Sequence, residues 1–135
     1  MDSWALLVVD AANVMGSRPD GWWRDRAAAA ARLRDELAEV GGVDGVGLPD
    51  LPPPVEVLLV VEGRARGIPS IERVRVCDAD GSGDDAIVAL VGAEQSARTR
   101  VVVTADRELR ARVTALGAQV QGPGWLLGAL GSGRG

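Results

Sequence analysis

The sequence predicts an α/β fold, a three-layer sandwich with a mostly parallel central sheet of four to five strands. Short, continuously apolar runs recur at residues 4–10, 55–61 and 100–104. Continuous apolarity is typical of strands buried on both faces, as in a parallel sheet. Segments with helical spacing lie between these runs. Strands that alternate with helices form a parallel sheet with helices on both faces.

The first half of the chain supplies two of these strands. Its expected elements are a strand at 4–10, a helix at 22–40 capped by Asp20, a Gly- and Pro-rich loop at 41–54, a strand at 55–61 and a basic turn at 63–69. A stripe of apolar residues at helical spacing predicts the helix, and Asp is a favoured N-cap. One ring of the pair Trp22 and Trp23 could be exposed for base stacking. We expect Trp23 to pack into the helix interface.

The second half continues the alternation of strands and helices. Its expected elements are an edge strand at 71–76, a loop at 77–83, a helix at 84–97, a strand at 100–104, a helix at 106–116, a short strand at 119–121 and a helical turn at 125–130. The run at 71–76 alternates apolar and polar residues, which indicates a half-exposed strand at the sheet edge. No internal repeat interrupts the pattern.

Length and composition indicate one domain. The chain has 135 residues, of which 47% are hydrophobic and 25% charged, as is typical of a globular domain with a hydrophobic core. We expect that domain to span residues 1–130, followed by a disordered Gly-rich tail at 131–135. No apolar run approaches the roughly 20 residues of a transmembrane helix, so no membrane association is expected. The single Cys77 cannot form an internal disulfide, which favours a reducing, cytoplasmic location.

Charge and missing residue types exclude several classes of function. The net charge of −4 argues against a protein that coats nucleic acid by charge alone. The absence of histidine excludes a Ser-His-Asp triad and removes the usual general base and zinc ligand. The absence of lysine excludes a Walker phosphate loop and a receiver domain. Ala12 lies two residues after Asp10, where a haloacid-dehalogenase-like phosphatase needs a second Asp.

Acidic side chains follow the expected strands. They are Asp10, Glu62, the pair Asp84 and Asp85, and Asp106. Ligands of an open parallel sheet bind at the carboxyl ends of its strands. The strand at 4–10 is the most central candidate and the strand at 100–104 its expected neighbour, so Asp10 and Asp106 should lie close together. Glu62 is a candidate outer member of the same edge.

Carboxylates gathered at one edge repel one another, and this sequence has no lysine or histidine to neutralise them. A hard divalent cation removes that repulsion. Mg²⁺ and Mn²⁺ take oxygen ligands and keep positions open for water and substrate phosphates. Such an ion activates a bound water and stabilises a leaving oxygen, so that no protein base is required. The sequence therefore predicts Mg²⁺ or Mn²⁺ at the acidic edge.

Other interpretations of the central acids compete with this one. The stretch 81–86 reads G-S-G-D-D-A, which matches the dinucleotide fingerprint G-x-G-x-x-A. We reject that match because the fingerprint follows the first strand, and because two anions here occupy the helix N-terminus that a pyrophosphate needs. Ser82 with Asp85 also resembles a capping box, and Asp106 could be a simple N-cap. Asp10, after six apolar residues, is a poor choice for stability alone.

Three short motifs together resemble the NYN/PIN-like nucleases, and the YacP-like branch in particular. They are V-D-A-A-N-V at 9–14, G-D-D-A-I at 83–87 and V-T-A-D-R at 103–107. Their order and their positions on strands and helices agree with that branch over residues 4–122. The sequence departs from the branch at Ala11 and Ala12, where Gly-Tyr is usual, and at Glu62, where Asp is usual.

The resemblance implies a single PIN-like (NYN) domain that binds a divalent metal and cleaves RNA endonucleolytically. By matching position, Asp10, Asp84 and Asp106 become metal ligands and catalytic residues. Asn13 becomes a polar companion that orients a carboxylate, a water or the substrate. Asp85 becomes the second, assisting acid of the central pair.

Arginines beside these motifs are candidates to bind RNA phosphates. They are Arg18 after the first motif, Arg64 and Arg66 after the second strand, and Arg107 in the third motif. A solvated surface position explains each of them equally well.

We therefore expect a divalent-metal-dependent ribonuclease that acts on single-stranded or structured RNA. A nucleotide pyrophosphohydrolase is the enzymatic alternative, because it would use similar acids and Mg²⁺. A non-catalytic PIN-like module that binds RNA or protein is the alternative from another class, and the intact set of acids argues against it. A homodimer and a ribosome or other protein partner are further candidates.

Overall fold

A computed structural model describes residues 4–94 and 98–132 of the chain. Within these residues five parallel strands form one sheet, in the order β3-β2-β1-β4-β5. The strands are β1 (Ala5–Asp10), β2 (Val55–Val61), β3 (Val74–Asp78), β4 (Arg100–Val103) and β5 (Gln119–Gln121). The predicted α/β class is confirmed, and the sheet is parallel throughout rather than mostly so.

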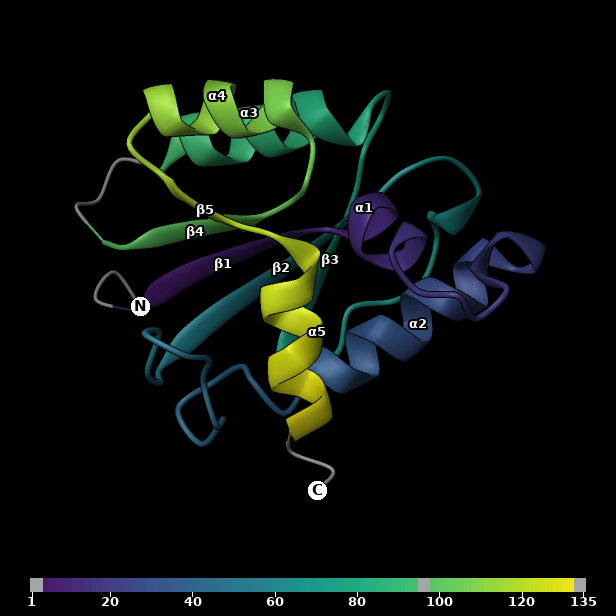
Figure 1. Cartoon of the computed structure of the whole chain (residues 1–135), viewed down its shortest axis with the longest axis horizontal. Helices are drawn as coiled ribbons and strands as arrows, with labels where there is room; N and C mark the ends of the chain where they lie inside the picture. Colours follow the sequence, from purple (N-terminus) through teal and green to yellow (C-terminus); the bar gives the residue numbers. More distant parts are fainter. Residues whose placement is uncertain (1–3, 95–97, 133–135) are drawn as a thin grey trace.

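Helices cover both faces of this sheet (Figure 1). Helices α3 (Gly83–Ala93) and α4 (Arg107–Ala115) cover one face, and α1 (Ala11–Gly16), α2 (Arg26–Leu37) and α5 (Pro123–Ser132) cover the other. Successive side chains of a strand point to opposite faces. Accordingly Leu6 and Val8 pack in the core under α3 and α4, while Leu7 and Val9 pack in the core on the opposite side. The three-layer prediction is confirmed.

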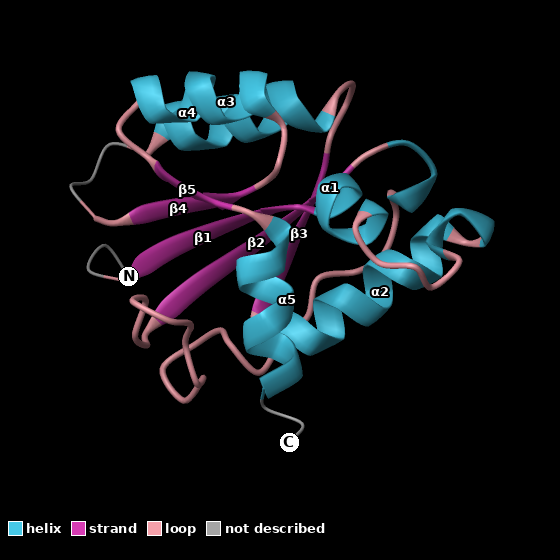
Figure 2. Cartoon of the chain, in the orientation of Figure 1, coloured by secondary structure: helices cyan, strands magenta, loops and turns pink. Residues whose placement is uncertain are grey.

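The central strand β1 pairs with β2 on one side and β4 on the other (Figure 2). Asp10 is opposite Val60 of β2, and Val9 is opposite Val103 of β4. Because all three strands run in the same direction, the residues that follow them emerge at one edge of the sheet. We call this the carboxyl edge, and it positions the candidate site.

The short helix α1 was absent from the sequence prediction. It begins directly after β1, and Asp10 is its N-cap. The six residues of α1 include only three buried ones, Ala11, Val14 and Met15, which is too short a stretch to display a helical period. The residue identified as a candidate ligand therefore also starts a helix.

The helix predicted at 22–40 is interrupted. Its first part is a 3₁₀ turn, η1 (Trp22–Arg24), and Asp25 leaves helical geometry with φ −152°. The Asp25 side chain accepts a hydrogen bond from the backbone N–H of Ala28 at 3.0 Å, so Asp25 and not Asp20 caps α2.

The two adjacent tryptophans have different environments. Trp22 is half-buried and packs against the core on the α1 and α2 side. Trp23 is 56% exposed, so the prediction that Trp23 packs into the helix interface is wrong. The 3₁₀ turn causes this difference, because consecutive residues in a tight turn project in different directions.

Several other boundaries differ from the prediction. The edge strand lies at Val74–Asp78 instead of 71–76, and the helix predicted at 84–97 ends at Ala93, with 95–97 outside the described residues. Residues 131 and 132 of the predicted disordered tail belong to α5, because Leu126 and Leu130 anchor that helix in the core. Residues 133–135 lie outside the described range. In the described part of the chain, no helix is long and apolar enough to cross a membrane.

Candidate active site

Asp10 is held rigidly at the carboxyl edge. It is 4% exposed, and its Oδ1 accepts a hydrogen bond from the backbone N–H of Asn13 at 3.4 Å. Its Oδ2 accepts bonds from the side-chain amide of Asn13 at 3.0 Å and from the hydroxyl of Thr104 at 2.9 Å. Burial raises the pKa of Asp10, as does the charge of Glu62, while the bonds from Thr104 and Asn13 lower it; the net direction is upward.

Asn13 and Thr104 connect the ends of β1 and β4. The side-chain oxygen of Asn13 accepts a hydrogen bond from the backbone N–H of Ala105 at 3.1 Å. A backbone N–H can only donate, so the amide oxygen of Asn13 faces Ala105 and its NH₂ group faces Asp10. The hydroxyl oxygen of Thr104 accepts from the backbone N–H of Asp106 at 3.2 Å. Asn13 therefore bonds to the carboxylate of Asp10, and the orienting role that the family resemblance implies for it stays a prediction.

Thr104 is a site residue that the sequence analysis did not select. It is fully buried and follows the buried strand β4 directly. A buried hydroxyl is costly unless it is hydrogen-bonded, and this one is a donor to Asp10 and an acceptor from Asp106. The signal available in the sequence was its position within V-T-A-D-R, after three consecutive valines.

Asp84 begins the helix α3 and faces the other acids. Its pKa is raised, first by burial and then by the negative charges of Asp106, Asp10 and Glu62, while Arg112 lowers it. The charges of Asp106, Asp10 and Glu62 thus act on Asp84 across the carboxyl edge. A direct link joins Asp10 and Asp106, because the hydroxyl of Thr104 bonds to the carboxylate of one and the backbone N–H of the other.

The glycine at position 83 allows Glu62 to approach the start of α3. The carboxylate of Glu62 accepts a hydrogen bond from the backbone N–H of Gly83, which is one of the N–H groups that a helix start leaves without a partner. A Cβ at position 83 would lie 3.2 Å from Oε2 of Glu62. The hydroxyl of Ser82 accepts from the N–H of Asp85 at 3.1 Å. Protein side chains therefore use the N–H groups that a phosphate cradle would offer.

Asp85 and Asp106 each have a structural partner. Asp85 is exposed, and its Oδ1 lies 3.1 Å from Nη1 of Arg112 on α4. Asp106 caps α4, because its Oδ1 accepts from the N–H of Leu109 at 3.0 Å. The capping roles considered for Ser82 and Asp106 are thus present. The cap occupies one oxygen of Asp106, and its other oxygen remains a potential ligand.

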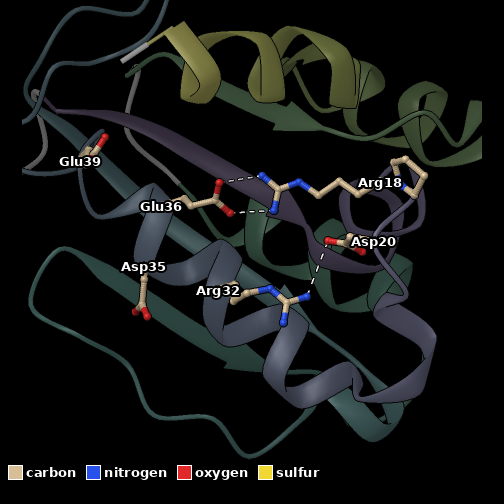
Figure 3. A pocket seen from close by; sticks show the side chains of 7 residues that line it. Arg18, Asp20, Arg32, Asp35, Glu36 and Glu39 are labelled. Atoms are coloured by element: carbon tan, nitrogen blue, oxygen red, sulfur yellow. Dashed lines mark hydrogen bonds and ion pairs between the residues drawn. The ribbon is translucent and has the colours of Figure 1, made fainter. Parts of the chain in front are cut away.

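The four candidate arginines lie in different places. Arg64 and Arg66 follow β2 in the 3₁₀ turn η2 (Gly63–Ala65) and its next residue, and Arg107 follows β4; all three are exposed. Arg18 instead forms two hydrogen bonds with Glu36 of α2, at 2.7 and 2.8 Å. Figure 3 shows this pair in a surface hollow of about 620 Å³ that also contains Arg32 and Asp20. Arg18 therefore pairs with Glu36 rather than with the acidic side chains of the carboxyl edge.

The donor chemistry of the carboxyl edge suits a hard cation. In residues 4–94 and 98–132, no three carboxylate or thiol groups form a ready-made metal-ligand set. Mg²⁺ takes carboxylate oxygens together with several waters, so the oxygens of Asp10, Asp84 and Asp106 have the right donor chemistry although they form no ready-made set. The raised pKa values of Asp10 and Asp84 reflect burial and negative charge, and a cation offsets both effects.

The fold and the edge define a parallel α/β domain, consistent with a PIN-like fold, with acidic side chains at the carboxyl ends of its strands. The chain is similar to the crystal structure of Rae1 (YacP) from Bacillus subtilis, with a TM-score of 0.71 and 21% identity over 94% of this chain and 74% of that one. A mutant of Rae1 matches with a TM-score of 0.70 and 20% identity over 95% of this chain and 76% of the other.

The fold likeness confirms the resemblance to the YacP-like branch that the three motifs indicated. At about one-fifth identity, it is a likeness of fold. No protein-family model matches the sequence, and no curated protein matches it.

Proposed function

We propose that this protein is a divalent-metal-dependent ribonuclease that hydrolyses RNA phosphodiesters at its carboxyl edge. The observation that carries the proposal is that Thr104 joins Asp10 to the backbone of Asp106, while the negative charges of both aspartates raise the pKa of Asp84. Perturbed pKa values cluster at functional sites, and this supports the proposal although Asp10 and Asp106 also cap helices. The three nuclease-like motifs and the fold likeness to Rae1 (YacP) support RNA as the substrate.

Each acid has a separate role in this proposal. A bound Mg²⁺ or Mn²⁺ would supply an activated water and a positive charge at the leaving oxygen. Asp10 would be the fixed ligand, because Asn13 and Thr104 hold its carboxylate in one orientation. Asp106 would use the oxygen that does not cap α4. Asp84, at a partly exposed helix start, would complete the protein ligands.

Exposed arginines would position the substrate. Arg64 and Arg66 lie after β2 and Arg107 after β4, all at the edge where the acids gather. Guanidinium groups bind phosphate oxygens through paired hydrogen bonds. They would hold the phosphates that flank the scissile one, while the net negative charge of the protein keeps non-specific binding weak.

A cleavage assay tests the proposal. The protein is incubated with single-stranded and structured RNA in Mn²⁺, Mg²⁺ or EDTA, together with Asp84→Asn and the control Asp80→Asn. Asp80 is an exposed aspartate four residues away that takes no part in the proposed site. We expect metal-dependent cutting by the wild type and by Asp80→Asn, and its loss in Asp84→Asn.

The same assay separates the alternatives. Equal cutting by Asp84→Asn and the wild type would contradict the site. Hydrolysis of free nucleoside triphosphates with no RNA cutting would establish the pyrophosphohydrolase alternative. Metal-independent RNA binding with no hydrolysis of either substrate would instead indicate a binding module.

A further inference from the structure

A cavity adjoins the carboxyl edge on the side of α1. Its volume is about 330 Å³, at the small end of the range of about 300–1,000 Å³ for small-molecule sites. Its lining includes Ala12 and Met15 of α1, Trp22 of η1, Arg26 of α2, Glu62 after β2, and Gly81 before α3. The proposed hydrolysis makes no use of it. We call this cavity the Trp22 pocket.

An aromatic ring and a guanidinium group lie together in the Trp22 pocket. Trp22 is half-buried against the core, and Trp23 meets it edge-on with ring centroids 6.2 Å apart. Cζ of Arg26 lies 5.3 Å from the centroid of the Trp22 ring. The guanidinium group therefore lies over one face of the Trp22 ring, and a flat aromatic ligand stacks on the other face of the indole or on the guanidinium plane.

The charges of the pocket balance and favour an uncharged ring. The lining includes one carboxylate, Glu62, and one guanidinium group, Arg26. A phosphate would gain from Arg26 and be repelled by Glu62, whereas a nucleobase carries no charge at neutral pH. The apolar Met15 and Ala12 also favour a ring over an anion.

The pocket is also a near neighbour of the proposed reaction centre. Ala12 follows Asp10 by two residues, and Gly81 precedes Asp84 by three. A strand of RNA with one phosphate at the carboxyl edge therefore has an adjacent base beside the pocket. A Cβ built at Gly81 meets no atom within 4 Å, which indicates open space at that position.

We propose that the Trp22 pocket binds one nucleobase of the RNA next to the scissile phosphate. This inference rests on the proposed ribonuclease function, and it identifies a base subsite for it. Single-stranded RNA is the matching form, because a base must leave its helical stack to enter a pocket. The exposed Trp23 does not line the pocket, so the proposal assigns stacking to Trp22 alone.

Equilibrium binding tests the pocket apart from hydrolysis. A fluorescein-labelled single-stranded RNA is titrated in EDTA with the wild type, Trp22→Leu and the matched control Trp23→Leu. We expect Trp22→Leu to weaken binding about tenfold, as expected for loss of one stacked base, and Trp23→Leu to change it less than twofold. An RNA that lacks the base at one position should bind the wild type about tenfold more weakly than the complete RNA does. Trp22→Leu should bind the two RNAs equally.

Folding and cleavage controls make each result decisive. Thermal melts check that Trp22→Leu folds. Arg26→Gln is a second variant at an exposed side chain, and we expect it to weaken RNA binding several-fold. Wild-type cutting in Mn²⁺ with no effect of Trp22, Arg26 or any single base would overturn the pocket and leave the nuclease intact. Base-dependent binding without cutting would support the pocket and overturn the nuclease. Absence of both RNA binding in EDTA and cutting in Mn²⁺ would overturn both proposals, whereas cutting without detectable binding in EDTA would overturn the pocket alone.

Discussion

The hydroxyl of Thr104 donates a hydrogen bond to Oδ2 of Asp10 at 2.9 Å, although the two residues are 94 positions apart. The same hydroxyl oxygen accepts the backbone N–H of Asp106 at 3.2 Å. One buried hydroxyl therefore fixes two of the three candidate ligands relative to each other. The parallel pairing of β1 with β4 makes this possible, because both strands end at the same edge.

Thr104→Val removes this hydroxyl and keeps the branched shape of the side chain. Asp10 loses a donor in buried surroundings, and the N–H of Asp106 loses its acceptor in partly buried ones. We expect the free energy of unfolding to fall by about 1–3 kcal/mol, the usual cost of leaving such groups unsatisfied. Because the bond lowers the pKa of Asp10, its loss should raise that pKa and move the acidic limb of the pH–rate profile to higher pH. Urea unfolding and cleavage rates measure the two effects.

Thr104→Ser is the matched control for Thr104→Val, since it keeps the hydroxyl and loses only a methyl group. It should retain the pH–rate profile of the wild type. An unchanged profile in Thr104→Val, despite lowered stability, would show that Thr104 supports the fold without influencing Asp10.

Asp84→Asn should stabilise the metal-free protein at neutral pH. Burial and neighbouring negative charges raise the pKa of Asp84 above its ordinary value of 3.8, so the folded protein disfavours the ionised form. Below pH 3.8 the carboxyl group is protonated in both the folded and the unfolded protein. As the pH rises from 3.8 through the higher folded-state pKa, the unfolded protein ionises more readily than the folded one, and the folded protein loses stability. Melting temperatures in EDTA should therefore be higher for Asp84→Asn at pH 7, with the difference shrinking as the pH falls towards 3.8.

Metal should reverse this order of stability. Mg²⁺ or Mn²⁺ binds only the folded protein, and so raises the melting temperature of the wild type by mass action. Asp84→Asn should gain less from the same concentration, and Asp80→Asn should respond as the wild type does. A lower melting temperature of Asp84→Asn in EDTA at pH 7 would indicate that Asp84 stabilises the start of α3.

The strands were predictable because a strand that is buried on both faces has a continuously apolar sequence, which can be recognised without knowing its tertiary contacts. The predicted bounds 55–61 and 119–121 match β2 and β5. The helix α1 was missed, since six residues show no period and their cap, Asp10, had been assigned to the site. The break before α2 depends on Asp25 adopting a non-helical φ, which the apolar stripe at 22–40 does not reveal.

The site was predictable as far as strand order determined it. A parallel sheet places Asp10 and Asp106 at one edge whatever their side chains contact, and that inference succeeded. The two bonds from Arg18 to Glu36 could not be predicted, because they depend on how α2 packs beside the end of α1. The role of Thr104 likewise requires knowing which oxygen of Asp10 faces β4.

Arg18→Gln should affect stability and leave RNA binding unchanged. The side chains of Arg18 and Glu36 are 22% and 14% exposed, and paired charged hydrogen bonds in such surroundings contribute about 1–3 kcal/mol. Arg64→Gln should weaken RNA binding and leave stability unchanged, because Arg64 is exposed beside the carboxyl edge. Urea unfolding measures the stability of the two variants, and RNA titrations at several salt concentrations measure their binding. Weaker RNA binding by Arg18→Gln, with unchanged stability, would return Arg18 to the substrate-binding set.

Asp85→Asn distinguishes the two members of the central acid pair. Asp85 pairs with Arg112 at 3.1 Å on the surface between α3 and α4, and its side chain is 75% exposed. An exposed ion pair contributes about 0–1 kcal/mol, so we expect stability close to that of the wild type. RNA cutting should also be retained, within about threefold, whereas Asp84→Asn abolishes it, because the charges of Asp10 and Asp106 act on Asp84 while Asp85 pairs with Arg112 on the surface. Cleavage rates of both variants at saturating Mn²⁺ provide the comparison. Equal loss of activity in the two would show that Asp85 leaves Arg112 and joins the site when metal and RNA are bound.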